Sequence, residues 1–283
     1  MNHDDAPILP FTGERFTPEC VREIAYEHWH RYAFARPLAA GRRVLDAACG
    51  EGYGSALLAT TACDVLGVDV ADEAVAHARQ RYGDIANLRF ERGDATALDH
   101  LPDATFDLIV SFETLEHVQA QARMLDGFVR LLADDGLLLV STPDKRTYSE
   151  LTGEVNPYHV RELYRDEFEA LLSARFPAYR LYGQKLLFQS ALWALDGQGG
   201  GVDAATAHGE RVEPGLDYAP LYYVAVCAKR PGALQGLPAL SLFGDAGESV
   251  YADYRDEVRR NRAAAAHIAH LEAELARLKG ETK

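Results

Sequence analysis

Two kinds of segment alternate along the chain. Short apolar runs are typical of buried strands, and apolar residues spaced by three or four are typical of amphipathic helices. Strands are predicted at residues 43–47, 65–70, 88–91, 106–112, 136–141, 179–185 and 221–229, and helices between them at 73–82, 124–132 and 165–173. Strands that alternate with helices predict right-handed crossovers and a doubly wound α/β fold with a mostly parallel sheet.

The last apolar run differs from the others. Within 221–229, Tyr222, Val224 and Val226 alternate with Tyr223, Ala225 and Cys227. Strict alternation is typical of antiparallel strands that have one face less buried than the other. We therefore expect one antiparallel strand, added on the edge side of a seven-stranded sheet.

The ends of the chain have other patterns. Residues 1–40 predict an irregular arm followed by a lid helix, which Thr17 caps, Pro18 begins and Pro37 ends. Residues 41–230 form the central domain, and its Gly-rich stretch 196–219 is expected to be a flexible surface loop. Residues 231–247 are predicted to be a linker.

Residues 248–283 predict a C-terminal helix. Its apolar residues Ile268, Leu271, Leu275 and Leu278 follow a three-four-three spacing, which amounts to about two heptads. A stripe of this length suits either packing on the helix's own domain or a short coiled coil that forms a homodimer. The sequence leaves both open.

Composition narrows the classes of function. Among 283 residues, 43 Asp and Glu outweigh 29 Lys and Arg, giving a net charge of −14, so we expect no nucleic-acid partner. The four cysteines have no metal-type spacing, and neither a signal pattern nor a run of 18 apolar residues occurs. These features predict a reduced, cytoplasmic protein without a membrane span.

The segment VLDAACGEGYG (44–54) carries the first sign of function. A strand enters a sharp turn in which Gly50, Gly52 and Gly54 let the backbone approach a ligand without a Cβ in the way. Asp69 follows about 20 residues later, where an acidic side chain can bind ribose hydroxyls. The competing interpretation of this turn is a nicotinamide dehydrogenase, but the glycine motif of those enzymes requires a glycine where this chain has Ser55.

This segment resembles the first motif of class I methyltransferases that use S-adenosyl-L-methionine (SAM), with Asp46, Gly50 and Gly52 in place and Ala48 where a glycine is usual. The substitution at Ala48 should narrow the turn only slightly. The resemblance covers roughly residues 40–230 by element order, so residues 41–230 are expected to be a Rossmann-like SAM-binding domain. It implies that Gly50 and Gly52 face the methionine part of SAM, that Asp69 binds its ribose, and that Asp94 and Ala95 bind its adenine. The full set of cofactor-binding residues implied in this way is Asp46, Ala48, Gly50, Gly52, Asp69, Val70, Asp94, Ala95, Phe112, Arg31 and Tyr32.

The segment SFETLEHV (111–118) follows the fourth strand. If a helix starts there, Glu113, Glu116 and His117 share one face, and NPYHVREL (156–163) supplies His159 from a later loop. Carboxylates with imidazoles suit Mg²⁺ or Mn²⁺, which could lower the pKa of a substrate hydroxyl. Two alternatives stay open: His117 or His159 as a catalytic general base without metal, or side chains that only order the helix and wall the pocket.

Two further resemblances concern the acceptor. Glu-x-x-Glu-His after the fourth strand is similar to metal-assisted O-methyltransferases of the ubiquinone pathway and of small-RNA 3′ ends, and His159 occupies a loop comparable to that of a later metal histidine in the RNA enzymes. RNA is discounted because this chain is acidic. The segments FTGERFTPE (11–19) and EHWHRYAFA (27–35) resemble bacterial methyltransferases encoded with surface-glycan (lipopolysaccharide) glycosyltransferases, which implies that Arg31 or Tyr32 lies near the methionine carboxylate. The plainer alternative is that Tyr32 packs the helix on the sheet.

The sequence therefore predicts a SAM-dependent O-methyltransferase whose acceptor is a sugar hydroxyl of a surface glycan or its precursor. A phenol, a quinone precursor or another small molecule is the alternative acceptor. An alternative of another class is a SAM-fold interaction protein without catalysis.

Overall fold

The structure is a computed structural model that describes residues 23–153, 155–192 and 201–281. Within these ranges, one sheet has the strand order β3-β2-β1-β4-β5-β9-β6. Its strands are β1 (Arg43–Ala47), β2 (Asp64–Asp69), β3 (Leu88–Arg92), β4 (Phe106–Ser111), β5 (Leu132–Pro143), β6 (Ala178–Gln184) and β9 (Tyr222–Ala228). The pairs among β1 to β5 are parallel, and β9 is antiparallel to both of its neighbours. The predicted doubly wound, mostly parallel sheet is confirmed.

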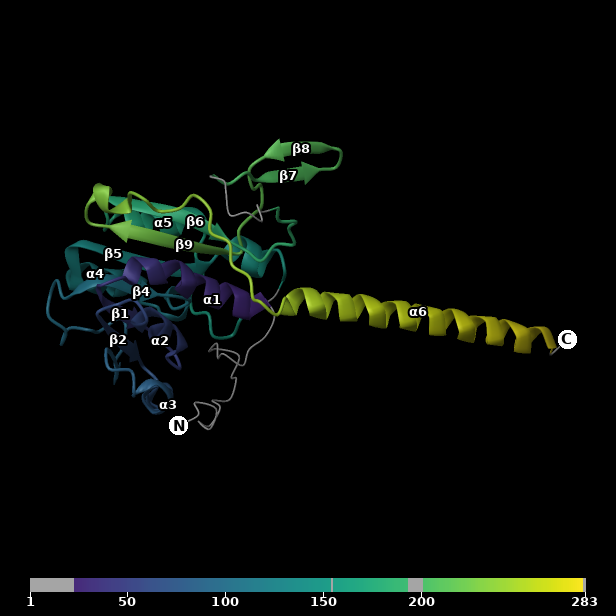
Figure 1. Cartoon of the computed structure of the whole chain (residues 1–283), viewed down its shortest axis with the longest axis horizontal. Helices are drawn as coiled ribbons and strands as arrows, with labels where there is room; N and C mark the ends of the chain where they lie inside the picture. Colours follow the sequence, from purple (N-terminus) through teal and green to yellow (C-terminus); the bar gives the residue numbers. More distant parts are fainter. Residues whose placement is uncertain (1–22, 154, 193–200, 282–283) are drawn as a thin grey trace.

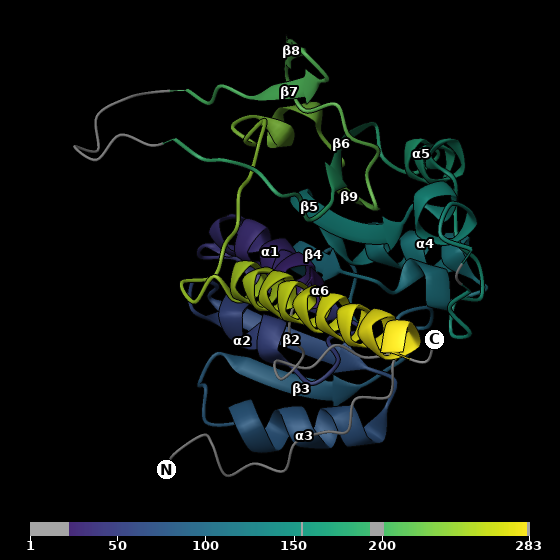
Figure 2. The same cartoon turned by 90° about the vertical axis from the view of Figure 1, so that its right-hand side faces the viewer.

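Helices cover both faces of the sheet (Figures 1 and 2). They are α1 (Glu23–Ala35), α2 (Tyr53–Ala59), α3 (Asp72–Tyr82), α4 (Gln121–Leu131) and α5 (Arg165–Ser173), with short helical turns η2 (Arg36–Ala39), η3 (Leu115–His117), η4 (Arg146–Glu150) and η5 (Pro231–Leu234). Alternate residues along each strand contribute to two apolar clusters: Val44 packs with α1, α2 and α3, and Leu45 packs with α4 and α5. Burial on both faces explains why the strands are continuous apolar runs.

The antiparallel strand β9 does not lie on the edge side of the sheet. It is inserted between β5 and β6, and all seven of its residues are buried. Val224 and Val226 enter one apolar cluster while Tyr223 and Cys227 enter the other. The alternation that predicted a less buried face instead divides residues between two buried faces, so the expected edge position was wrong.

Part of the predicted loop 196–219 has regular structure. Strands β7 (Ala205–His208) and β8 (Arg211–Pro214) form an antiparallel hairpin, and the Thr206 hydroxyl donates to the Gly215 carbonyl at 2.8 Å. Residues 196–200 lie outside the described residues, as does the predicted arm with its Thr17 cap. The flexibility of the loop and the domain limits remain predictions.

The C-terminal helix α6 (Ser249–Glu281) projects away from the sheet (Figure 1), and Figure 2 views it from its free end. The segment before it lies against the lid helix α1, where Phe243 stacks on His30 and contacts Tyr26 edge-on. No helix in the described ranges is both long enough and apolar enough to span a membrane.

Candidate functional site

The glycine turn joins the carboxyl end of β1 to α2. The Asp69 carboxylate, at the end of β2, accepts the Gly50 N–H at 2.8 Å and the Ala71 N–H at 2.9 Å. A carboxylate has about four lone-pair positions, so each Asp69 oxygen can still accept a hydroxyl. The glycine turn and Asp69 therefore lie side by side, as the sequence predicted.

Ala48 adopts a strained backbone conformation in this turn. Its φ is 63°, in the left-handed region that non-glycine residues rarely adopt, and Gly50 follows with a φ of 57°. The backbone thus keeps the conformation that a glycine would hold, and Ala48 bears the strain. The slight narrowing of the turn stays a prediction.

Gly52 and Gly54 make room for side chains of the protein itself. A Cβ on Gly52 would lie 2.7 Å from Cζ of Phe90, and one on Gly54 would overlap the ring of Tyr32. The sequence assigned this space to a ligand. The structure instead uses both glycines to let a strand residue and the lid helix pack closely.

Asp46 is fully buried beneath the turn. The Ser55 hydroxyl donates to its Oδ2 at 2.6 Å and the Tyr32 hydroxyl donates to its Oδ1 at 3.1 Å. Burial raises the pKa of Asp46 from 3.8 to about 7. Ser55, which counted in the sequence only as a mismatch with dehydrogenases, is thus a partner of Asp46, and Tyr32 ties the lid helix to the same carboxylate.

The other implied cofactor residues follow the strand ends. Val70 is 61% exposed after β2, and Asp94 is exposed after β3, where its Oδ1 accepts both the N–H and the hydroxyl of Thr96. Ala95 is half-buried beside Asp94, and Phe112 is buried after β4, edge-on to Tyr32 at 5.1 Å. These residues share the carboxyl edge of the sheet, where doubly wound folds bind ligands.

Arg31 is a buried cation that points from the lid helix toward the end of β4. Its Nε donates to Oε1 of Gln184 at 2.8 Å, and its guanidinium lies 4.5 Å from the Tyr222 ring centroid. Its Nη2 lies 3.5 Å from the Glu113 carboxylate, yet Nη1 and Nη2 have no hydrogen-bond partner. A buried guanidinium with unused donors is a site for an anionic group.

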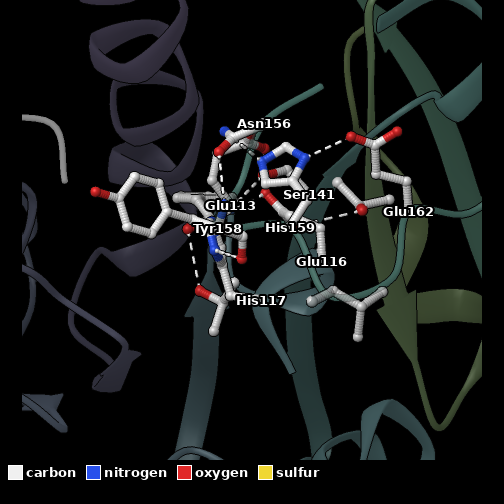
Figure 3. Close-up of polar contacts among 12 residues, drawn as sticks. Glu113, Glu116, His117, Ser141, Asn156, Tyr158, His159 and Glu162 are labelled. Atoms are coloured by element: carbon white, nitrogen blue, oxygen red, sulfur yellow. Dashed lines mark hydrogen bonds and ion pairs between the residues drawn. The ribbon is translucent and has the colours of Figure 1, made fainter. Parts of the chain in front are cut away.

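Three ligand-capable side chains converge below the lid helix (Figure 3). One ligand atom from each of Glu116, His117 and His159 lies within 4.8 Å of the others. Glu116 is fully buried, its Oε1 has no hydrogen-bond partner, and burial raises its pKa well above the usual value. We call these three residues the Glu-His-His cluster.

Neighbouring groups orient both imidazoles. His117 Nδ1 lies 3.0 Å from the Tyr158 carbonyl, which requires a proton on Nδ1 and directs the Nε2 lone pair toward Glu116. His159 Nδ1 lies 2.6 Å from the Glu162 carboxylate, so its Nε2 can accept a hydrogen bond from the Asn156 amide. The Glu116 carbonyl also accepts two N–H groups, from Val160 and Arg161, which fixes the later loop over the first segment.

Glu113 does not join the cluster. The predicted helix is only the three-residue turn η3, and Glu113 precedes it with a φ of 50°. Its carboxylate accepts the Ser141 hydroxyl at 2.6 Å and faces Arg31. The expectation that three residues share one helical face was therefore wrong, because the chain turns at Glu113 before helical geometry begins.

Two residues of the site, one buried and one half-buried, were missed in the sequence. Glu27 is 5% exposed, and burial raises the pKa of its carboxyl to about 7. Gln184 bridges the lid helix to β6, since its amide also donates to the Glu27 carbonyl at 2.9 Å. A glutamate in a helix and a glutamine at a strand end carry no distinctive local pattern, and their partners are distant in sequence.

Comparisons with known proteins agree with this geometry. A family model described as a methyltransferase domain matches residues 38–186. A Mycobacterium tuberculosis protein named as a probable S-adenosylmethionine-dependent methyltransferase is 39% identical over 168 residues, which cover 58% of this chain and 60% of that protein. A ubiquinone biosynthesis O-methyltransferase of Psychrobacter arcticus is 34% identical over 128 residues, covering 44% of this chain and 49% of that protein.

The chain thus spans at most 60% of the length of these two curated relatives. Among solved structures, a SAM-dependent methyltransferase from Thermotoga maritima superposes with a TM-score of 0.51 at 19% identity, covering 72% of this chain and 90% of that one. At this identity the match shows a shared fold.

Proposed function

We propose, on the premise that this chain belongs to the family of SAM-dependent methyltransferase domains, that it transfers a methyl group from SAM to a hydroxyl oxygen. The observation that supports oxygen as the acceptor atom is the Glu-His-His cluster at the carboxyl edge of the sheet. A hydroxyl has a high pKa and must lose its proton as it attacks. The cluster brings together basic groups that can accept this proton. SAM, when bound, supplies the methyl group.

The SAM-binding residues are proposed from their free hydrogen-bonding capacity. Asp69 would accept the two ribose hydroxyls, and Arg31 would bind the methionine carboxylate through Nη1 and Nη2. Asp94 and Ala95 would contact the adenine, with Val70 and Phe112 beside it. Asp46 is proposed to act indirectly, because its carboxylate is enclosed by Ser55 and Tyr32.

Calorimetry with SAM and S-adenosylhomocysteine tests this assignment. Asp69→Ala should lose about tenfold or more in affinity, as expected when hydrogen bonds to a charged group are removed. Asp72→Ala, at a side chain 78% exposed, is the matched control and should bind normally. No binding by the wild-type protein would favour the interaction-protein hypothesis, and binding of NAD in place of SAM would favour a dehydrogenase.

We further propose a divalent cation in the Glu-His-His cluster, where it would lower the pKa of the acceptor hydroxyl. The Glu116 Oε1, which has no hydrogen-bond partner, fits this role, as do two imidazoles whose Nδ1 atoms are held by a carbonyl and a carboxylate. His159 would bind the cation through Nε2 in place of its hydrogen bond from the Asn156 amide. One carboxylate with two imidazoles is a softer set of metal ligands than the two carboxylates with two imidazoles predicted from the sequence. It therefore favours Mn²⁺ over Mg²⁺.

Glu116→Gln keeps the shape of the side chain and removes the negative charge that it would carry with a cation bound. We expect it to abolish Mn²⁺ binding measured by calorimetry and to lower methyl transfer at least about 100-fold, as does exhaustive chelation. Glu257→Gln, on exposed α6, is the control and should change neither quantity. Activity that survives chelation would instead support His117 or His159 as a metal-free general base.

For the acceptor we propose a sugar hydroxyl of a surface glycan or its precursor. The support is the resemblance of two N-terminal segments to methyltransferases encoded with surface-glycan glycosyltransferases. Residues 11–19 lie outside the described residues, and residues 27–35 belong to the lid helix α1. The competing acceptor is a phenol or quinone precursor, which the O-methyltransferase relative favours. Labelled SAM offered with hexose, nucleotide-sugar and catechol panels separates them, since transfer to catechols alone would reject the sugar.

The chain is also proposed to act as a homodimer through α6, away from this site.

A further inference from the structure

The apolar stripe of α6 is exposed on a helix that leaves its own domain. Side chains of Ile268, Leu271, Leu275 and Leu278 are 48–56% exposed and line one shallow groove, flanked by Glu272 and Glu274. Every residue described from 259 to 280 is exposed. Within the described residues, this part of the helix does not pack on its own domain, which was one of the two outcomes left open by the sequence. Most helices gain much of their stability from burying such a stripe, which favours a partner for α6.

We infer that α6 pairs with α6 of a second copy as a parallel, in-register, two-stranded coiled coil. In the heptad that fits the stripe, Ile268 and Leu275 occupy a positions, and Leu271 and Leu278 occupy d positions. In the first of these heptads, β-branched Ile268 at a with Leu271 at d favours two strands. Asn261 falls on the a position one heptad before Ile268, where a buried asparagine pair fixes register and dimeric state.

The charges beside the stripe fit this arrangement. In a parallel pair, each g residue meets the e residue of the following heptad on the other helix. Glu274 at g then faces Lys279 at e of the second copy, and His267 at g faces Glu272 at e. Both pairs bring complementary groups together and occur twice by symmetry.

Antiparallel pairing would bury less of α6. The apolar stripe spans 268–278, near the free end of a helix that begins at Ser249. If two stripes overlapped head to tail, Asn261 would face no described residue of the second α6, and the first half of each helix would have no partner within that helix. Parallel pairing overlaps one stripe with the other and also sets Asn261 against Asn261, so it is the orientation that the residues from 261 to 278 favour.

Light scattering with size-exclusion chromatography on the full chain tests the inference. We expect twice the 31.2 kDa mass of one chain for the wild type and the mass of one chain for Leu271→Glu/Leu275→Glu. Two buried leucines replaced by carboxylates should weaken the dimer by about 100-fold or more. Ala269→Glu/Ala273→Glu, at b and f positions, adds the same charge outside the seam and should remain dimeric.

Cysteine cross-linking tests the orientation. In a Cys20→Ser/Cys63→Ser background, Leu278→Cys should form an intermolecular disulfide under mild oxidation because parallel d positions meet, whereas Ala269→Cys should not. A monomeric wild type overturns the inference, as does a trimeric or tetrameric mass. A dimer in which Leu278→Cys fails to cross-link overturns the parallel orientation. Binding of S-adenosylhomocysteine by the monomeric variant shows that its domain is folded, so these outcomes are separate from those of the proposed reaction.

Discussion

Ala48 bears backbone strain at the turn beside the proposed SAM site. An alanine in the left-handed region costs roughly 1–2 kcal/mol, and glycine would remove that cost while losing about 0.5–1 kcal/mol in chain entropy. We therefore expect Ala48→Gly to raise the free energy of unfolding by up to about 1 kcal/mol, measured by urea denaturation.

The neighbouring Ala47 supplies the matched control. It lies in β1, is fully buried and is not among the residues with positive φ, so Ala47→Gly should lower the free energy of unfolding by about 1 kcal/mol. Equal destabilisation by both substitutions would contradict the assignment of strain to Ala48.

Asp46 makes stability depend on pH. Its folded pKa of about 7 lies above its ordinary value of 3.8, so the folded state holds a proton that the unfolded state releases. Stability is then greatest below pH 3.8 as far as this group is concerned, and it is lost as pH rises through 7. The full shift corresponds to roughly 4 kcal/mol.

Asp46→Asn removes this titration. Between pH 5 and 8, its free energy of unfolding should fall less than that of the wild type, with a remainder from Glu27, whose pKa is also raised to about 7. Asp99→Asn, at a side chain 81% exposed, should keep the wild-type slope. An Asp46→Asn slope equal to that of the wild type would show that Asp46 does not titrate in this range.

Among single residues, sequence predicted the groups that have a local signature. Gly50 and Asp69 follow strands in a recognisable spacing, and Glu116, His117 and His159 were predicted together and do converge. Glu113 was placed wrongly, since its left-handed backbone depends on contacts with Ser141 and Arg31. Such contacts join residues far apart in the chain and leave no local pattern.

Among elements, periodicity identified the strands of the sheet, but it did not give their order. The position of β9 follows from the need to bury both of its faces, and alternation alone cannot distinguish two apolar faces from one. Likewise η3 stops after three residues although its sequence allows a helix. The spacing of apolar residues indicates whether a segment forms a helix or a strand, and tertiary packing decides the position of that element in the fold and its length.

The Gln184 side chain hydrogen-bonds the lid helix α1 to the edge strand β6. Gln184 accepts from Arg31 Nε and donates to the Glu27 carbonyl. Gln184→Ala would leave buried polar groups of α1 without partners, so we expect a loss of about 1–3 kcal/mol in the free energy of unfolding. Gln189→Ala, on an exposed residue nearby, should cost less than about 0.5 kcal/mol in the same denaturation experiment.

At the scale of the whole molecule, α6 and the domain are expected to be energetically independent. Truncation after Glu248 removes exposed helix but keeps Phe243 on His30 and the buried Leu234 and Leu237. We expect the truncated chain to keep its thermal midpoint within about 2 °C and its affinity for S-adenosylhomocysteine. Truncation after Arg230, which removes those contacts, should lower the midpoint clearly. A fall of similar size after both truncations would show that α6 stabilises the domain.

The inserted position of β9 has a consequence for how the protein is made. Residues 222–228 lie between two strands that precede them in the chain, so β5 and β6 cannot be joined in the sheet until β9 has left the ribosome. Until then, β5 presents an apolar edge that can pair with other chains. Nascent chains that stop short of β9 are therefore expected to aggregate more readily than chains that include it.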